Sequence, residues 1–157
     1  MAHDAVDAPG ADPREDLYER DYYSWALEQG QALRARRTEA LDWENLAEEV
    51  EGLVRTEVRE LKSRLEVLLV HLLKWRYQPK KRSRSWRLTI REQRHRLAQL
   101  TGENPGLEST LGESVTAAYE IARLVTARET RLAERTFPPA SPWSFGQMTD
   151  ADFWPDS

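Results

Sequence analysis

Apolar side chains recur every three or four residues along one long segment, residues 42–78, which is typical of a helix with one apolar face. Asp42 is a favourable N-cap before this segment, and Pro79 cannot continue the helical hydrogen bonds beyond it. The pattern therefore predicts a helix over 42–78, about 55 Å long. The apolar positions are Trp43, Leu46, Val50, Leu53, Val54, Val58, Leu61, Leu65, Leu68, Leu69, Leu72 and Trp75.

The same spacing predicts three further helices, over residues 16–36, 84–101 and 105–131. Ser83 or Ser85 is a suitable N-cap for the helix over 84–101, and Gly102 is expected to end it. Asn104, followed by Pro105 at the first helical position, is expected to begin the last of the three.

Residues 137–155 combine prolines with large aromatic side chains, and we expect this segment to lie across the helices as a strap. Ser144 is expected to cap a single helical turn within the strap. Residues 1–15 are expected to form a flexible tail. The predicted fold is thus all-α: a single domain, 16–157, in which four principal helices form an antiparallel bundle around the long helix.

The long helix is predicted to extend beyond its partners by several turns. Its surplus apolar surface must then be covered by the strap or by a second subunit, so the sequence leaves a homo-oligomer through this helix open.

Composition narrows the classes of function. The 157 residues include no cysteine, which excludes disulfides, zinc–thiolate sites and cysteine nucleophiles. The acidic N-terminus does not look like a signal peptide, and the longest uncharged apolar run, residues 67–73, is far too short for a membrane span. We therefore expect a cytoplasmic protein that needs neither a metal nor a cofactor and makes no membrane contact.

Charge is distributed unevenly, although the net charge is only −4. Residues 1–60 carry 7 basic and 16 acidic side chains, whereas residues 74–96 carry 10 basic side chains and one acid. The second segment has the composition of a phosphate-binding surface. Its candidate anion-binding residues are Lys80, Lys81, Arg82, Arg84 and Arg87. The alternative is that these cations pair with acids of the same chain.

A second candidate site consists of polar residues on or near the apolar face of the long helix. Glu57, Arg64 and His71 recur every seven residues, and His95 is the other histidine outside the tail. The simpler interpretation is that these side chains bond to neighbouring helices. The functional interpretation is a small polar active site between helices.

Several short motifs resemble a known family. They are LDWENLAEEV at 41–50, HLLKW at 71–75, RSRSW at 82–86, TIREQR at 89–94 and DFWP at 152–155. In this order they resemble the bacterial domain-of-unknown-function family 29, from about Tyr18 to Pro155. The resemblance implies an all-helical protein, and it supplies neither an activity nor site residues.

Two classes of function follow. The first is a non-enzymatic interaction module whose basic surface binds a protein or a nucleic acid. The second is an enzyme built on Glu57, Arg64, His71 and His95, although no recognised catalytic motif is present.

Overall fold

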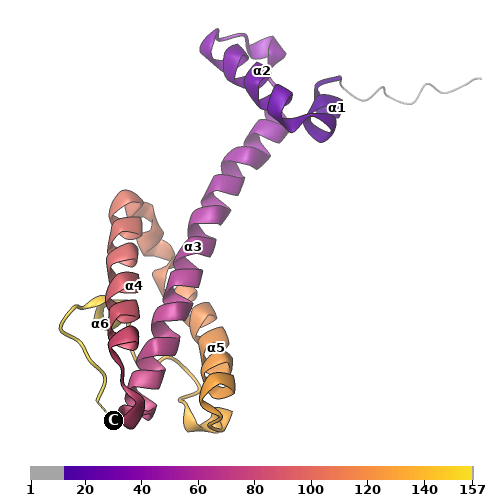
Figure 1. The fold of residues 1–157 in the computed structure, drawn as a ribbon. Coiled ribbons are helices and arrows are strands. Elements are labelled where there is room, and N and C mark those ends of the chain that lie inside the picture. The colour runs from indigo at the N-terminus through magenta and orange to yellow at the C-terminus, as the bar shows by residue number, and fades with distance from the viewer. Residues whose placement is uncertain (1–12, 157) are drawn as a thin grey trace, which may run out of the picture. The chain divides into compact units, whose positions relative to one another are not determined.

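The computed structural model describes residues 13–156, and these residues form an all-α fold without β-strands (Figure 1). The helices are α1 (Pro13–Arg20), α2 (Tyr22–Arg34), α3 (Trp43–Tyr77), α4 (Arg84–Glu103), α5 (Leu111–Thr130) and α6 (Phe145–Thr149). Short 3-10 turns connect several of them, at Thr38–Ala40, Pro79–Lys81, Pro105–Thr110 and Glu134–Thr136. Contacts divide the chain into two compact units, Met1–Val54 and Arg55–Ser157. The expectation of one domain over 16–157 stays a prediction.

In the first unit, the single helix predicted over 16–36 is wrong, because the chain breaks at Asp21. The Asp21 carboxylate accepts hydrogen bonds from the backbone N–H and the hydroxyl of Ser24, at 3.1 and 2.6 Å. This N-cap begins a new helix, α2, directly after α1. Because α1 already begins at Pro13, the predicted tail over 1–15 is too long, and its residues 1–12 lie outside the described part.

Buried polar groups fix the first unit around Asp42, which is 6% exposed. The Trp25 indole N–H and the Asn45 amide donate to the Asp42 carboxylate, at 2.9 and 2.8 Å. The Gln29 side-chain carbonyl accepts from the Asp42 backbone N–H at 2.8 Å. Asp42 thus precedes α3 as predicted, and it also anchors α2.

Two tyrosines bind a second carboxylate of this unit. The hydroxyls of Tyr18 and Tyr22 donate to opposite oxygens of Glu49, at 2.6 and 2.8 Å. The bond to Glu49 stabilises the protonated hydroxyl and raises the pKa of Tyr18 to about 12.

The apolar face at the start of α3 is exposed in the described chain. Trp43, Val50, Leu53 and Val54 are 62%, 62%, 67% and 63% exposed. Periodicity identifies an apolar face but does not show which turns of it have neighbours. Cover by a second subunit stays a prediction.

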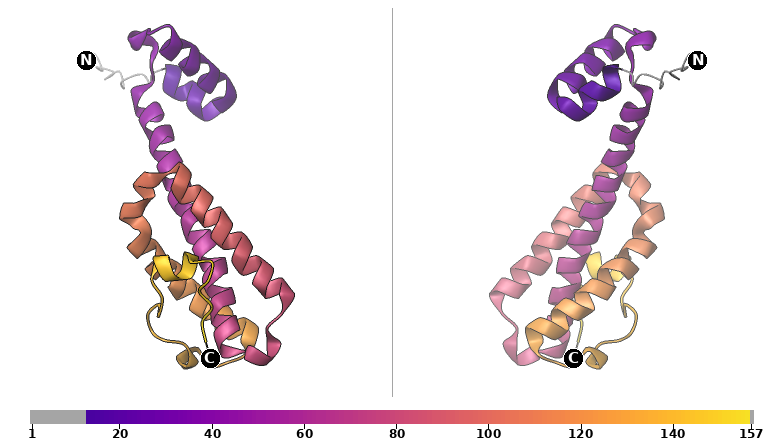
Figure 2. Two further views of the ribbon diagram at one scale, coloured as in Figure 1. Left: turned by 90° about the vertical axis from the view of Figure 1, so that its left-hand side faces the viewer. Right: turned by 90° about the vertical axis from the view of Figure 1, so that its right-hand side faces the viewer.

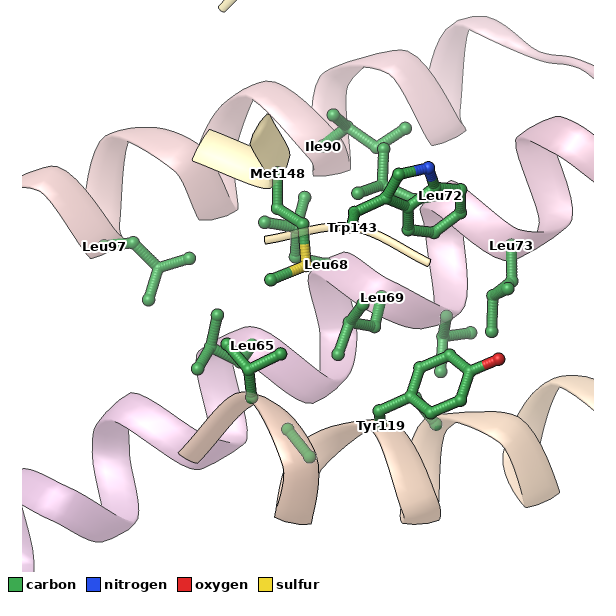
Figure 3. Close-up of a cluster of buried hydrophobic side chains, with 14 of the residues drawn as sticks. Leu65, Leu68, Leu69, Leu72, Leu73, Ile90, Leu97, Tyr119, Trp143 and Met148 are labelled. Atoms are coloured by element: carbon green, nitrogen blue, oxygen red, sulfur yellow. The ribbon is translucent and has the colours of Figure 1, made fainter. Parts of the chain in front are cut away.

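The second unit is a helical bundle in which the C-terminal part of α3 lies between α4 and α5 (Figures 1 and 2). Its core consists of leucines of α3 with side chains from the other two helices and the strap (Figure 3). Leu61, Leu65, Leu68, Leu69, Leu72, Leu73, Ile90, Leu97, Ala122, Tyr119, Phe137 and Met148 are at most 1% exposed.

Helix boundaries in the second unit differ from the predictions at two points. Ser83 caps α4 by accepting a hydrogen bond from the Trp86 N–H at 3.1 Å. Ser83 was one of the two predicted caps. Gly102 does not end α4, which continues to Glu103. The Asn104 side chain makes no capping hydrogen bond, and its amide donates to the Leu100 carbonyl at 3.1 Å. Residues 105–110 form a 3-10 turn before α5 begins at Leu111.

The C-terminal strap is present and is bound by the buried side chain of Arg94. Its guanidinium donates to the backbone carbonyls of Met148, Ala151 and Phe153, at 2.8, 3.4 and 2.6 Å. Ser144 caps α6 within the strap, in a capping box with Gln147. The strap is therefore held by both apolar burial and charged hydrogen bonds.

Replacing Arg94 with methionine should release this end of the strap, because methionine fills similar volume but donates no hydrogen bond. We expect Arg94→Met to lower the free energy of unfolding by about 3 kcal/mol, since bonds to charged groups contribute about 1.5–3 kcal/mol each and do not add fully. Denaturant unfolding and limited proteolysis within residues 137–156 would measure the effect. Arg91→Met, at an exposed position of the same helix, is the matched control. Equal stability of the two variants would contradict this role for Arg94.

Candidate functional site

The five predicted anion-binding residues lie together where α3 turns into α4. Pro79 ends α3, the 3-10 turn Pro79–Lys81 reverses the chain, and Ser83 starts α4. Lys80, Lys81, Arg82, Arg84 and Arg87 are all exposed, and we call them the basic surface. Within residues 13–156, none of the five forms an ion pair with a carboxylate. The part of the segment proposed to bind anions is thus not neutralised by the described acids.

Two tryptophans hold Arg82 and Arg87 of this surface in place. The Arg82 guanidinium lies 5.0 Å from the Trp75 ring centroid, and its Nε–H donates to the Trp75 carbonyl at 2.8 Å. Arg87 lies 5.7 Å from the Trp75 ring and 5.9 Å from the Trp154 ring. The two rings are themselves in contact, with centroids 4.7 Å apart. Arg94 contacts the Trp154 ring at 5.2 Å, so the strap supports this arrangement.

A hollow of about 370 Å³ opens at this place on the surface. Trp75, Arg82, Ser83, Arg84 and Arg87 line it. Three guanidinium groups therefore surround one small depression beside an indole ring that is only 7% exposed. Arginine presents several N–H donors in a planar fork, which suits oxygen atoms of phosphate and carboxylate groups.

Other cations of the basic segment do have partners. Lys74 forms an ion pair with Glu129 of α5, and its ammonium also lies 5.3 Å from the Trp86 ring centroid. Arg96 pairs with Glu92 at 2.9 Å. The alternative of pairing within the chain therefore holds for this part of residues 74–96, while the basic surface has no acidic partner among residues 13–156.

The structure does not bring the second candidate site together. Glu57 lies 3.5 Å from the Asn104 amide, beside a hollow of about 400 Å³ that Glu60, Arg96 and Glu103 also line. Arg64 forms an ion pair with Glu60 of its own helix at 3.5 Å. The Glu57 contact with Asn104, at the end of α4, matches the simpler structural interpretation, whereas the Arg64 pair lies within α3 itself.

The two histidines have different surroundings. His71 is half-buried, and its Nδ1–H donates to the Val67 carbonyl at 2.8 Å. Burial lowers the pKa of His71, and Lys74 acts in the same direction. His95 is exposed and lines another hollow of about 650 Å³ with Arg91, Arg94 and residues of the strap. A catalytic role for Glu57, Arg64, His71 and His95 stays a prediction.

The described residues include neither a metal-binding cluster of side chains nor a helix suited to span a membrane. No group of three or more His, Asp or Glu side chains there is arranged to hold a metal ion. None of the helices in residues 13–156 combines the length and apolar character that crossing a membrane requires.

A family model described as a domain of unknown function, DUF29, matches residues 17–154. The chain belongs to this family. The match confirms the resemblance drawn from the short motifs and covers α2 to α6 entirely. No curated protein and no solved structure matches the chain.

Three members of the site, Trp75, Arg94 and Trp154, were not among the candidate anion-binding residues predicted from the sequence. All three lie within the short motifs that carry the family resemblance, HLLKW, TIREQR and DFWP. The motifs are far apart in the sequence but meet at the two tryptophan rings. Their presence in the motifs was a sequence signal that could have pointed to these residues. Only the fold, however, shows which motif residues make contact.

The lowered pKa of His71 predicts a pH-dependent stability. Because the folded state disfavours the protonated ring, the contribution of neutral His71 is present above the pKa of the unfolded chain, about 6.5, and is lost as the pH falls through the lower folded pKa. We expect the melting temperature of the wild type to fall between pH 7.5 and pH 5 by more than that of His71→Gln. His95→Gln, at an exposed site, is the control and should follow the wild type. Identical pH profiles for all three proteins would refute the prediction.

Proposed function

We propose that this protein is a non-enzymatic interaction module whose basic surface binds the phosphate groups of a nucleic acid. The observation that carries the proposal is the set of five exposed cations without acidic partners among the described residues, three of them around one hollow. Cations grouped in this way attract a polyanion and gain affinity through the release of its counterions.

Nucleic acid suits this surface better than an acidic protein does. Stable protein interfaces depend on a few large apolar or aromatic anchors that become buried in the complex. Around the basic surface Trp75 and Ile90 are already buried, and Trp86 is half-buried. Leu88 is the one large apolar side chain exposed on α4. Binding to phosphate oxygens needs no such anchor, because the charged contacts supply most of the affinity.

The net charge of −4 limits the proposal to local binding. Outside the basic surface the chain carries more acids than bases, so it should not coat nucleic acid without regard to orientation. We infer a contact in which one end of the second unit meets the phosphates.

The enzyme alternative has less support. An active site requires titratable groups that converge on one cavity, with pKa values shifted by their neighbours. Glu57, Arg64, His71 and His95 have separate surroundings instead. The cytoplasmic location and the second subunit expected from the sequence stay predictions.

Neutralising part of the basic surface should weaken nucleic-acid binding and reduce its dependence on salt. For the triple variant Lys80→Gln, Lys81→Gln, Arg82→Gln we expect the slope of log affinity against log salt concentration to fall by about 0.7–0.9 for each phosphate that the variant no longer binds. Fluorescence anisotropy with a labelled oligonucleotide between about 50 and 200 mM salt, which brackets physiological ionic strength, would measure both quantities.

The matched control is Arg59→Gln, Lys62→Gln, Arg128→Gln, which removes the same charge from exposed positions elsewhere in the second unit. It should keep nearly the affinity and slope of the wild type. If both triple variants lose affinity equally, net charge rather than the basic surface determines binding. If the wild type binds neither RNA nor DNA at low salt, the proposed function is wrong.

A further inference from the structure

We propose that the hollow beside Trp75 is a seat for a phosphate monoester, the terminal phosphate of a nucleic-acid strand. This inference rests on the proposed function and makes it more specific. Contact with the rest of the strand would come from the remainder of the basic surface, Lys80 and Lys81.

Two of the guanidiniums that line the hollow, those of Arg82 and Arg87, are oriented before any ligand binds. The Nε–H of Arg82 is bonded to the Trp75 carbonyl, and its guanidinium lies near the Trp75 ring, which leaves the terminal nitrogens for a ligand. Arg87 contacts both Trp75 and Trp154. A fixed fork loses less conformational entropy on binding than a freely rotating surface side chain does. This distinguishes the hollow from a general cationic surface.

The number of cations fits a monoester better than a diester. A terminal phosphate has three free oxygens and a charge of about −1.5 to −2 near pH 7. An internal phosphodiester has two free oxygens and a single negative charge. The guanidinium groups of Arg82, Arg84 and Arg87 surround one hollow. A terminal phosphate has one free oxygen for each of these three groups, whereas an internal phosphodiester has only two.

Base stacking does not compete with this interpretation. Single-stranded nucleic acid often binds by stacking its bases on exposed aromatic rings. The Trp75 ring is 7% exposed and is already in contact with Arg82, Arg87 and Trp154. A ligand in the hollow therefore meets guanidinium N–H groups rather than a free aromatic face. The volume of about 370 Å³ is near the lower end for ligand pockets, which suits a phosphate with part of one nucleotide.

The test compares two oligonucleotides of the same sequence on the full chain, one with a 5′-phosphate and one with a 5′-hydroxyl. We expect the phosphorylated strand to bind about tenfold more tightly or better, since one charge-assisted contact corresponds to roughly that factor. Inorganic phosphate alone should bind and should displace the phosphorylated strand. Tryptophan fluorescence would detect inorganic phosphate directly, because Arg82 and Arg87 contact the Trp75 ring.

Variants locate the effect. Arg84→Gln should remove most of the tenfold preference, because Arg84 lines the hollow at an exposed position. Arg87→Lys keeps the charge but loses the planar fork, so it should also reduce the preference. Arg91→Gln, an exposed arginine outside this hollow, is the control and should retain it. Circular dichroism should show that all three variants remain folded.

The preference should also depend on pH in one direction. The second pKa of a phosphate monoester is about 6, so the ligand loses charge below that value while the guanidiniums stay protonated. The tenfold difference should therefore shrink between pH 7.5 and pH 5.

The outcomes separate the two proposals. Equal binding of both oligonucleotides overturns the phosphate seat and leaves the basic surface as a nucleic-acid contact. Binding of inorganic phosphate without either oligonucleotide overturns the proposed function and, with it, the assignment of the hollow to a strand terminus, and leaves a site for free phosphate. If neither phosphate nor an oligonucleotide binds, both proposals are wrong.

Discussion

The guanidinium of Arg94 is the interaction on which the arrangement of the second unit depends. It is 5% exposed and donates to three strap carbonyls rather than to a carboxylate. A buried arginine requires acceptors for its donors, and a strap that passes over α4 with its carbonyls turned inward supplies them. The strap has little regular structure, so its backbone carbonyls are free to accept. Arg94 and these strap carbonyls therefore satisfy each other.

This bond also positions the candidate site. Once Phe153 is held by Arg94, the next residue, Trp154, lies against Trp75. The pair of indole rings then contacts Arg82, Arg87 and Arg94. Three like charges so close together repel one another, and the ring faces offset only part of that cost. An anion in the hollow would relieve the remaining repulsion, which is a physical reason for arginines that lack acidic partners within residues 13–156 to be gathered there.

The sequence predicted those features that depend on neighbouring residues. Asp42 and Pro79 bound α3 as expected, and Ser144 begins α6. The sequence failed where a local hydrogen bond competes with a continuous pattern, as at Asp21, where the bond to Ser24 divides one apolar period into two helices. The sequence also failed to predict burial, because burial depends on how far the neighbouring segments extend along a helix. Leu61 and Val54 belong to the same periodic face, yet one is fully buried and the other 63% exposed.

The candidate site likewise combines residues that the sequence identified with contacts that only the fold shows. Composition and position were enough to identify Lys80, Lys81, Arg82, Arg84 and Arg87, because a turn between helices exposes long charged side chains. Composition could not distinguish Arg94 from Arg91, three residues earlier on the same helix, although one is buried and the other exposed. Nor could it show that Lys74 pairs with Glu129, 55 residues away. What makes a cation available to a ligand is the absence of a tertiary partner, and that property appears only when distant segments are brought together.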